Sequence, residues 1–164
     1  MKSVAPRALI VLGALLTLGA VNVAVVGKER VKRDGEIVYL PLAPVDPRSL
    51  VQGDYMALRF ALASDIARRD EVAQHAEREG EAAFAPLALD DKRVASLAAG
   101  AAPAAIKLRY RIRGGQVWLG TNAFFFEEGT AERFRGARYG EFRVDPGTGE
   151  AVLVGLRNGD LQAL

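Results

Sequence analysis

The chain opens with a long apolar segment that is bounded by basic residues. Residues 8–27 read ALIVLGALLTLGAVNVAVVG, carry no charge, and have polar side chains only at Thr17 and Asn22. A helix of this length rises about 30 Å, which is the thickness of the hydrocarbon core of a bilayer. The pattern therefore predicts a transmembrane helix that contacts the lipid bilayer through residues 8–27.

This segment is too long for the apolar part of a typical cleaved signal peptide, which spans about 7–15 residues and ends at a small-residue cleavage site. Val25 and Gly27 match such a site poorly, and the chain has no cysteine for lipid attachment. We therefore expect an uncleaved signal anchor with basic flanks over residues 1–33. A single β-rich domain is expected over residues 34–164.

Beyond residue 34 the pattern changes to short segments in which apolar and polar residues alternate or β-formers predominate, as is typical of strands. Gly114 and Gly115 separate two of these segments and predict a tight hairpin, since glycine accepts the positive φ angles of short turns. The apolar run at 151–156 predicts a strand that is buried on both faces. The clearest of the expected strands are 36–40, 54–62, 106–113, 116–119, 139–144 and 151–156.

One segment outside the apolar run has a helical pattern. Ser64 is expected to cap a helix over residues 66–79, and Gly80 is expected to end it. A short second helix is expected at 130–137, and the alanine-rich stretch 98–105 is expected to be a loop. With about eight strands, the sequence predicts a mainly β (α+β) fold: a β-sandwich or partly open barrel with one or two surface helices, behind an N-terminal transmembrane helix.

The flanks of the apolar segment and the domain differ in net charge. The chain has 22 basic and 20 acidic residues, but six of the basic residues and only Glu29 among the acidic ones flank the apolar segment. From Asp34 onward 16 basic and 19 acidic residues remain, a net charge of about minus three. Nucleic-acid binding requires a concentrated basic face, so we expect no nucleic-acid partner.

The segment 46–60, called here the signature loop, is rich in turn-forming residues. Asp46 followed by Pro47 commonly begins a turn, and Gly53 can adopt a left-handed conformation just before a strand. Arg48 and Asp54 are close enough in sequence to form an ion pair across the loop. The interpretation that we favour is a structural loop that sets the register of the first strands. The alternative is a docking site, because loops on rigid strands commonly carry recognition.

The residues Gly53, Asp54, Tyr55, Leu58 and Phe60 give the chain a family resemblance. In this pattern and in the neighbouring runs PVDPRSL, FFFEEG and RYGEFRV, it resembles the GDYXXLXY-motif family of bacterial membrane-anchored proteins, which is defined by sequence and has no assigned activity. Phe60 lacks the hydroxyl of the last motif tyrosine, so no role of that phenol carries over. The run FFFEEG at residues 124–129 is called here the second motif, and its residues Phe126, Glu128 and Gly129 are further candidates.

The resemblance implies a non-enzymatic accessory or binding subunit of a membrane assembly, with a multi-pass membrane protein as partner. It also implies the bacterial inner (cytoplasmic) membrane and favours a periplasmic domain. The positive-inside rule opposes this orientation, because Lys28, Arg30, Lys32 and Arg33 outnumber Lys2 and Arg7 on the other side of the segment. We expect the exported orientation.

A basic stripe is predicted on the strand at 106–113. Lys107, Arg109, Arg111 and Arg113 would line one face, with neighbouring charges about 6.6 to 7 Å apart. Such a stripe could meet anionic lipid headgroups or an acidic partner. We favour pairing with carboxylates on adjacent strands, which supports many sheets.

Candidates for catalysis are few. Glu127 and Glu128 lie beside three phenylalanines, and with Asp54 they leave open the alternative of a cell-envelope hydrolase. His75 is the only histidine and the chain has no cysteine, so neither a zinc site nor a Ser-His-Asp triad can be assembled. We therefore predict no catalytic, metal or cofactor site.

Overall fold

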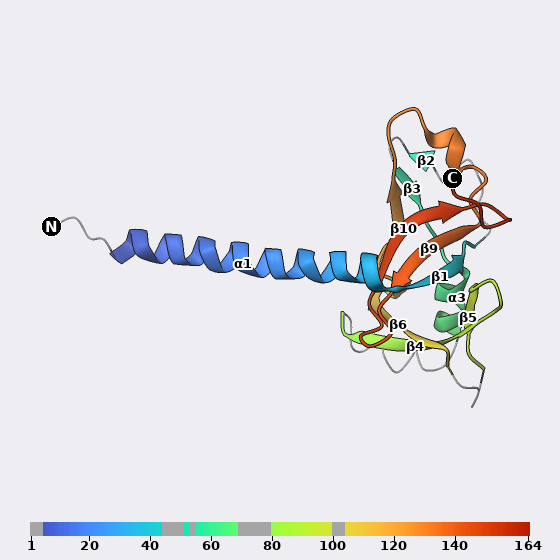
Figure 1. Cartoon of the computed structure of the whole chain (residues 1–164), viewed down its shortest axis with the longest axis horizontal. Helices are drawn as coiled ribbons and strands as arrows, with labels where there is room; N and C mark the ends of the chain where they lie inside the picture. Colours follow the sequence, from blue (N-terminus) through green and yellow to red (C-terminus); the bar gives the residue numbers. More distant parts are fainter. Residues whose placement is uncertain (1–4, 44–50, 53–54, 69–79, 100–103) are drawn as a thin grey trace.

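The computed structural model describes residues 5–43, 51–52, 55–68, 80–99 and 104–164. A long helix, α1 (Ala5–Asp34), leads into a β-rich domain (Figure 1). Within the described part of the chain, α1 is the one helix that is long and apolar enough to cross a membrane. The apolar side chains of residues 8–27 are exposed, as expected for contact with lipid.

The two polar side chains within the apolar run of α1 form hydrogen bonds inside the helix. Thr17 Oγ1 donates a hydrogen bond to Gly13 O at 2.9 Å, and Asn22 Nδ2 donates one to Leu18 O at 2.8 Å. An unpaired polar group would cost several kcal/mol in the hydrocarbon. These two residues are therefore compatible with a membrane-spanning helix.

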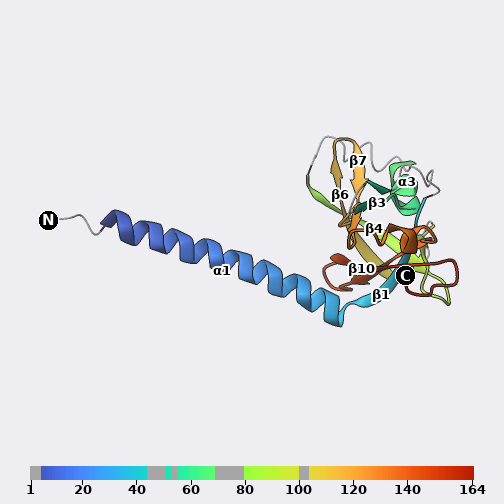
Figure 2. The same cartoon turned by 90° about the horizontal axis from the view of Figure 1, so that it is seen from above.

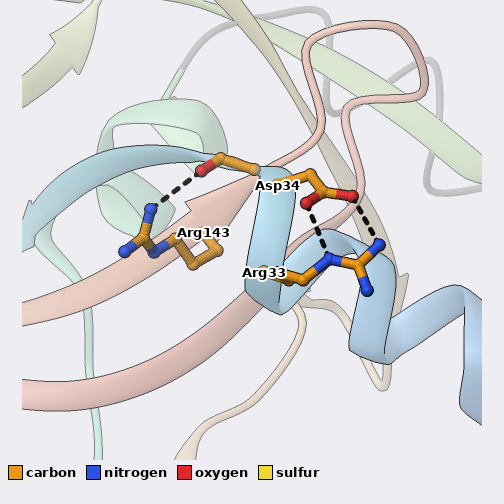
Figure 3. Close-up of polar contacts among 4 residues, drawn as sticks. Arg33, Asp34 and Arg143 are labelled. Carbon is orange, nitrogen blue, oxygen red and sulfur yellow. Dashed lines mark hydrogen bonds and ion pairs between the residues drawn. The ribbon is translucent and has the colours of Figure 1, made fainter.

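The helix ends in close contact with the domain (Figure 3). Gly35 N donates to Val31 O at 2.9 Å, and a Cβ at Gly35 would lie 3.0 Å from Val144 N, so only glycine fits here. Arg143 Nη1 donates to Gly35 O at 3.1 Å, while Arg33 pairs with the neighbouring Asp34. The anchor is thus attached to the sheet by direct contacts.

The strands form three antiparallel groups (Figures 1 and 2). The first has the order β1 (Glu36–Pro41), β9 (Tyr139–Val144) and β10 (Ala151–Arg157). The second has the order β2 (Val51–Gln52), β3 (Tyr55–Ala57) and β8 (Ala123–Phe125). The third has the order β5 (Ala95–Leu97), β4 (Ala82–Leu89), β6 (Ile106–Arg113) and β7 (Gln116–Trp118).

Isolated bridges join these groups into a curled half-barrel. Tyr39 bridges Val94 in parallel, and Leu42 bridges Phe60 in antiparallel fashion. All three groups and the short helix α3 (Ala61–Arg68) contribute to one core. Its largest fully buried side chains are Phe142, Leu40, Leu62, Leu87, Leu108, Leu119 and Leu156. The predicted mainly β class with helical additions is confirmed.

Two details of the predicted elements are wrong near the signature loop. The strand expected at 54–62 ends at Ala57, and α3 begins at Ala61, so Ser64 lies inside the helix and does not cap it. Leu62 and Ile66 are both buried, and their spacing of four residues places them on one helical face. Residues 69–79, where most of the expected helix falls, lie outside the described residues.

Other predictions have mixed outcomes. The hairpin at Gly114 and Gly115 is confirmed, and the short second helix is a 3₁₀ turn, η1 (Ala131–Phe134). The expectation that 151–156 is buried on both faces is wrong. Most of β10 is only half-buried because it is the outer strand of its group and has a register shift between Leu153 and Gly155.

Candidate functional site

The described part of the signature loop presents one aromatic pair. Tyr55 on β3 lies opposite Phe125 on β8, and their ring centroids are 5.8 Å apart. Phe125 is 75% exposed, and Tyr55 is half-buried. The predicted site residues Asp46, Pro47, Arg48, Gly53 and Asp54 lie outside the described residues, as does the ion pair expected between Arg48 and Asp54.

The remaining two motif positions belong to the core. Leu58 and Phe60 are both 4% exposed, and the ring of Phe60 meets that of Phe142 edge-on at 5.3 Å. A Cβ at Gly140 would lie 2.9 Å from Phe60 Cε1, so the ring fills the space left by glycine. The described motif segment 55–60 and the segment 138–144 therefore meet in the core, and Phe60 has a packing role.

The second motif forms a turn. Thr130 N donates to Glu127 O at 3.1 Å, and Gly129 has a φ of 80°, which non-glycine residues rarely adopt. Phe126 stacks on Phe134 with centroids 5.2 Å apart. Glu127 and Glu128 are exposed, so the turn does not hold these two carboxylates in a buried pair.

The prediction that the basic stripe pairs with carboxylates is wrong. On β4, the residues opposite Lys107, Arg109 and Arg111 are Pro86, Phe84 and Ala82. On β7, the residues opposite Arg111 and Arg113 are Trp118 and Gln116. No ion pair joins the four cations to a carboxylate in the described part of the chain. Their charges are therefore available to an external anion.

Three of these cations line an open groove of about 360 Å³. The groove is lined by Arg109, Arg111, Arg113 and Trp118 together with Lys28 of α1 and Glu150. Lys28 Nζ is paired with Glu150 Oε1. The guanidinium of Arg113 lies 5.3 Å from the centroid of the Trp118 ring, within the range of a cation–π contact. Lys107 lies on the same strand but outside the groove.

The turn between β9 and β10 leads into the groove lining at Glu150 and Ala151. The carboxylate of Asp145 accepts hydrogen bonds from Thr148 N at 2.7 Å and Gly147 N at 2.9 Å. These bonds, led by the one from Thr148, lower the pKa of Asp145. Gly149 O in turn accepts a hydrogen bond from Arg109 N at 2.8 Å. The turn is thereby fixed against β6, which places Glu150 beside the groove.

One buried charge was missed by the sequence reasoning. Glu141 is 7% exposed, and its Oε2 accepts from Arg157 Nε at 2.6 Å. It lies opposite Gly155, which leaves room for the two side chains to meet. Alternation along 139–144 could have shown that Glu141 shares a face with Tyr139 and Arg143, but not that Arg157 is its partner.

No described residue of the signature loop or of the turn at Glu127–Thr130 lines the groove. Neither Tyr55 nor Glu128 lines the groove, which instead combines the basic stripe with Lys28, a flank residue that the sequence assigned only to the anchor. No group of three or more His, Asp or Glu residues is arranged to hold a metal ion within the described ranges. The site that the structure presents is thus an open groove lined by four cationic side chains and one carboxylate.

Comparison with known proteins gives a family but no close relative. No curated protein and no solved structure matches the chain. The sequence profile described as GDYXXLXY protein matches residues 17–156, which extends from the middle of α1 to the end of β10. Since the match covers most of the chain, the protein belongs to the GDYXXLXY family.

Proposed function

We propose that this protein is a non-enzymatic, membrane-anchored subunit that docks on a membrane protein through Tyr55 and Phe125. The observation that carries the proposal is the 75% exposure of the Phe125 side chain beside the signature tyrosine. An exposed aromatic ring next to a second ring supplies much contact area at low entropic cost. Leu58 and Phe60 are buried in the core, so among the described motif residues Tyr55 is the one that reaches the surface.

Few other apolar side chains compete for this role. Outside α1, Phe84 and Phe125 are the exposed large apolar residues in the described part of the chain. They lie on different strand groups: Figure 1 shows β3 at one end of the domain and β4 at the other. Phe84 is therefore a matched control for Phe125.

The anchor favours a partner in the same membrane. Confining the domain to the bilayer surface raises its effective concentration relative to other membrane proteins, so a small contact surface is sufficient for binding. We take the partner to be a multi-pass protein of the bacterial inner membrane, with the domain on the periplasmic side. The hydrolase alternative lacks such support, because Glu127 and Glu128 are exposed and Asp54 lies outside the described residues.

The test is photocrosslinking of the full chain in cells. A benzophenone amino acid at position 125 should crosslink to one membrane protein, identified by mass spectrometry, whereas the same probe at position 84 should not. Phe125→Ser should reduce co-purification of that protein by about tenfold or more, as expected for an aromatic residue that dominates an interface.

Two results would refute the docking surface. One is an adduct that forms equally well from positions 84 and 125. The other is that Phe125→Ser leaves co-purification of the membrane protein as high as in the wild type, so that it has no more effect than the control Phe84→Ser. Both substitutions are at exposed positions, so the fold should persist, and circular dichroism of each variant checks this.

A further inference from the structure

The groove between α1 and β6 lies where lipid headgroups would be. The apolar run of α1 ends at Gly27, and Lys28 is the next residue. At 1.5 Å of rise per residue, residues 28–33 lie within about 10 Å of the hydrocarbon edge. The headgroup layer on each side of a bilayer is about 5 to 8 Å thick. Lys28 therefore lies in this layer, and it lines the groove.

The domain turns the same side toward the bilayer. Figures 1 and 2 show β6 and part of β4 on the side of the domain that faces back along α1. The Lys28–Glu150 ion pair and the buried side chain of Val31 hold the end of α1 against the domain. β6 therefore lies on the side of the domain next to the end of α1, and three of its cations, Arg109, Arg111 and Arg113, line the groove together with Lys28.

The chemistry of the groove suits a phosphate group. It contains four cationic side chains and one carboxylate, Glu150, which is already paired with Lys28. Arg111 and Arg113 are exposed, and no carboxylate within the described residues pairs with them. Guanidinium groups bind phosphate oxygens in a bidentate fashion, which lysine cannot do.

The aromatic residues of this face distinguish a membrane surface from a soluble ligand. Trp118 lines the groove, and tryptophan is enriched at membrane interfaces, where its ring lies at headgroup level. Phe84 is 54% exposed and lies opposite Arg109 on the same face of the sheet. A face that combines cations with exposed aromatic rings is typical of proteins that rest on anionic lipid.

We propose that this groove binds the phosphate of an anionic phospholipid headgroup beside the anchor. Arg109, Arg111 and Arg113 contact the phosphate, while Trp118 lies at the level of the glycerol and headgroup. A free phosphate ion has the same charge as the lipid phosphate but is not confined to the headgroup layer. An acidic protein partner would not require the cations to lie in that layer. The proposal concerns a surface other than Tyr55 and Phe125 and stands independently of it.

Trp118 is the only tryptophan in the chain and therefore reports on the groove directly. The full chain is reconstituted in phosphatidylcholine nanodiscs that contain increasing fractions of phosphatidylglycerol, and Trp118 emission is recorded. We expect a shift to shorter wavelength that saturates as the anionic fraction rises. Arg109→Gln and Arg111→Gln should each raise the midpoint fraction by about fivefold, the effect of removing one interfacial cation. Arg113 is left intact because it contacts the reporter ring.

Lys107→Gln is the matched control, since it removes the same charge from the same strand outside the groove, and it should leave the midpoint unchanged. The proposal is overturned if the wild-type emission does not respond to phosphatidylglycerol, or if Lys107→Gln shifts the midpoint as much as Arg111→Gln. It is also overturned if inorganic phosphate, glycerol phosphate or a polyglutamate peptide gives the full shift in pure phosphatidylcholine nanodiscs. Unchanged circular dichroism of each variant confirms that the fold is retained.

Discussion

Removing Arg157 should destabilise the domain more than removing Glu141, although the two residues form one ion pair. The side chain of Glu141 is 9% exposed and that of Arg157 is 25% exposed. Without Arg157 a carboxylate remains almost fully buried, whereas without Glu141 the guanidinium retains access to water and its contact with Leu161 O at 3.5 Å. An unpaired buried charge costs much more than an unpaired exposed one.

The expected magnitudes follow from this difference. Arg157→Met should lower the free energy of unfolding by about 3 to 5 kcal/mol, the range for breaking a buried pair. Glu141→Met should lower it by about 2 kcal/mol, the value of hydrogen bonds to a charged group. The double methionine variant should lie within about 1 kcal/mol of wild type, because apolar residues of similar volume can replace a buried pair.

The assay is urea unfolding of the full chain in detergent, followed by Trp118 emission and circular dichroism and extrapolated to water. Arg68→Met is the control: Arg68 pairs with Asp65 at 2.6 Å, but its side chain is 76% exposed, so a loss of at most about 1 kcal/mol is expected. The reasoning fails if the double variant loses the sum of the two single effects. It also fails if Glu141→Met is the more damaging change.

Two further predictions concern the β9–β10 turn and the orientation of the domain. Hydrogen bonding lowers the pKa of Asp145 in the folded state, so its contribution to stability is complete above its ordinary pKa and is lost as pH falls through the folded value. Asp145→Asn should therefore weaken the loss of stability in acid, and an equally steep pH profile of unfolding would contradict this. For orientation, the chain has no cysteine, so Asp160→Cys introduces a single thiol at an exposed position outside both proposed surfaces. A membrane-impermeant maleimide should label it in intact cells; labelling only after lysis would place the domain in the cytoplasm.

The elements that could be predicted from the sequence are those whose order of apolar and polar residues is characteristic within the segment itself. In β6 apolar and basic residues alternate without a break, and the Gly114–Gly115 turn follows at once, so strand, face and hairpin could all be predicted. The missed strand β4 reads AAFAPLAL, which is composed largely of alanine and has Pro86 inside it, both unfavourable for strands. β4 is a strand because it pairs with β6 along most of its length, which its own sequence does not reveal.

The groove could not be predicted because its residues are far apart in the chain. Lys28 belongs to the anchor, Arg111 to β6 and Glu150 to the β9–β10 turn, and only the fold brings them together. The basic stripe itself was visible in the sequence, but its cross-strand neighbours were not. Without β4 in the prediction, carboxylates were the reasonable partners, and Phe84 and Pro86 could not be foreseen.

The connection between anchor and domain decides whether the groove can act at the bilayer surface. A flexible linker would let the domain rotate away from the bilayer, and cations on β6 would then have no fixed position. Here α1 continues to Asp34 and passes directly into β1 at Glu36. Gly35 fits against Val144 N, and Arg143 donates a hydrogen bond to Gly35 O. No linker separates α1 from the domain, so the face of the domain beside the end of α1 has a fixed position relative to the helix.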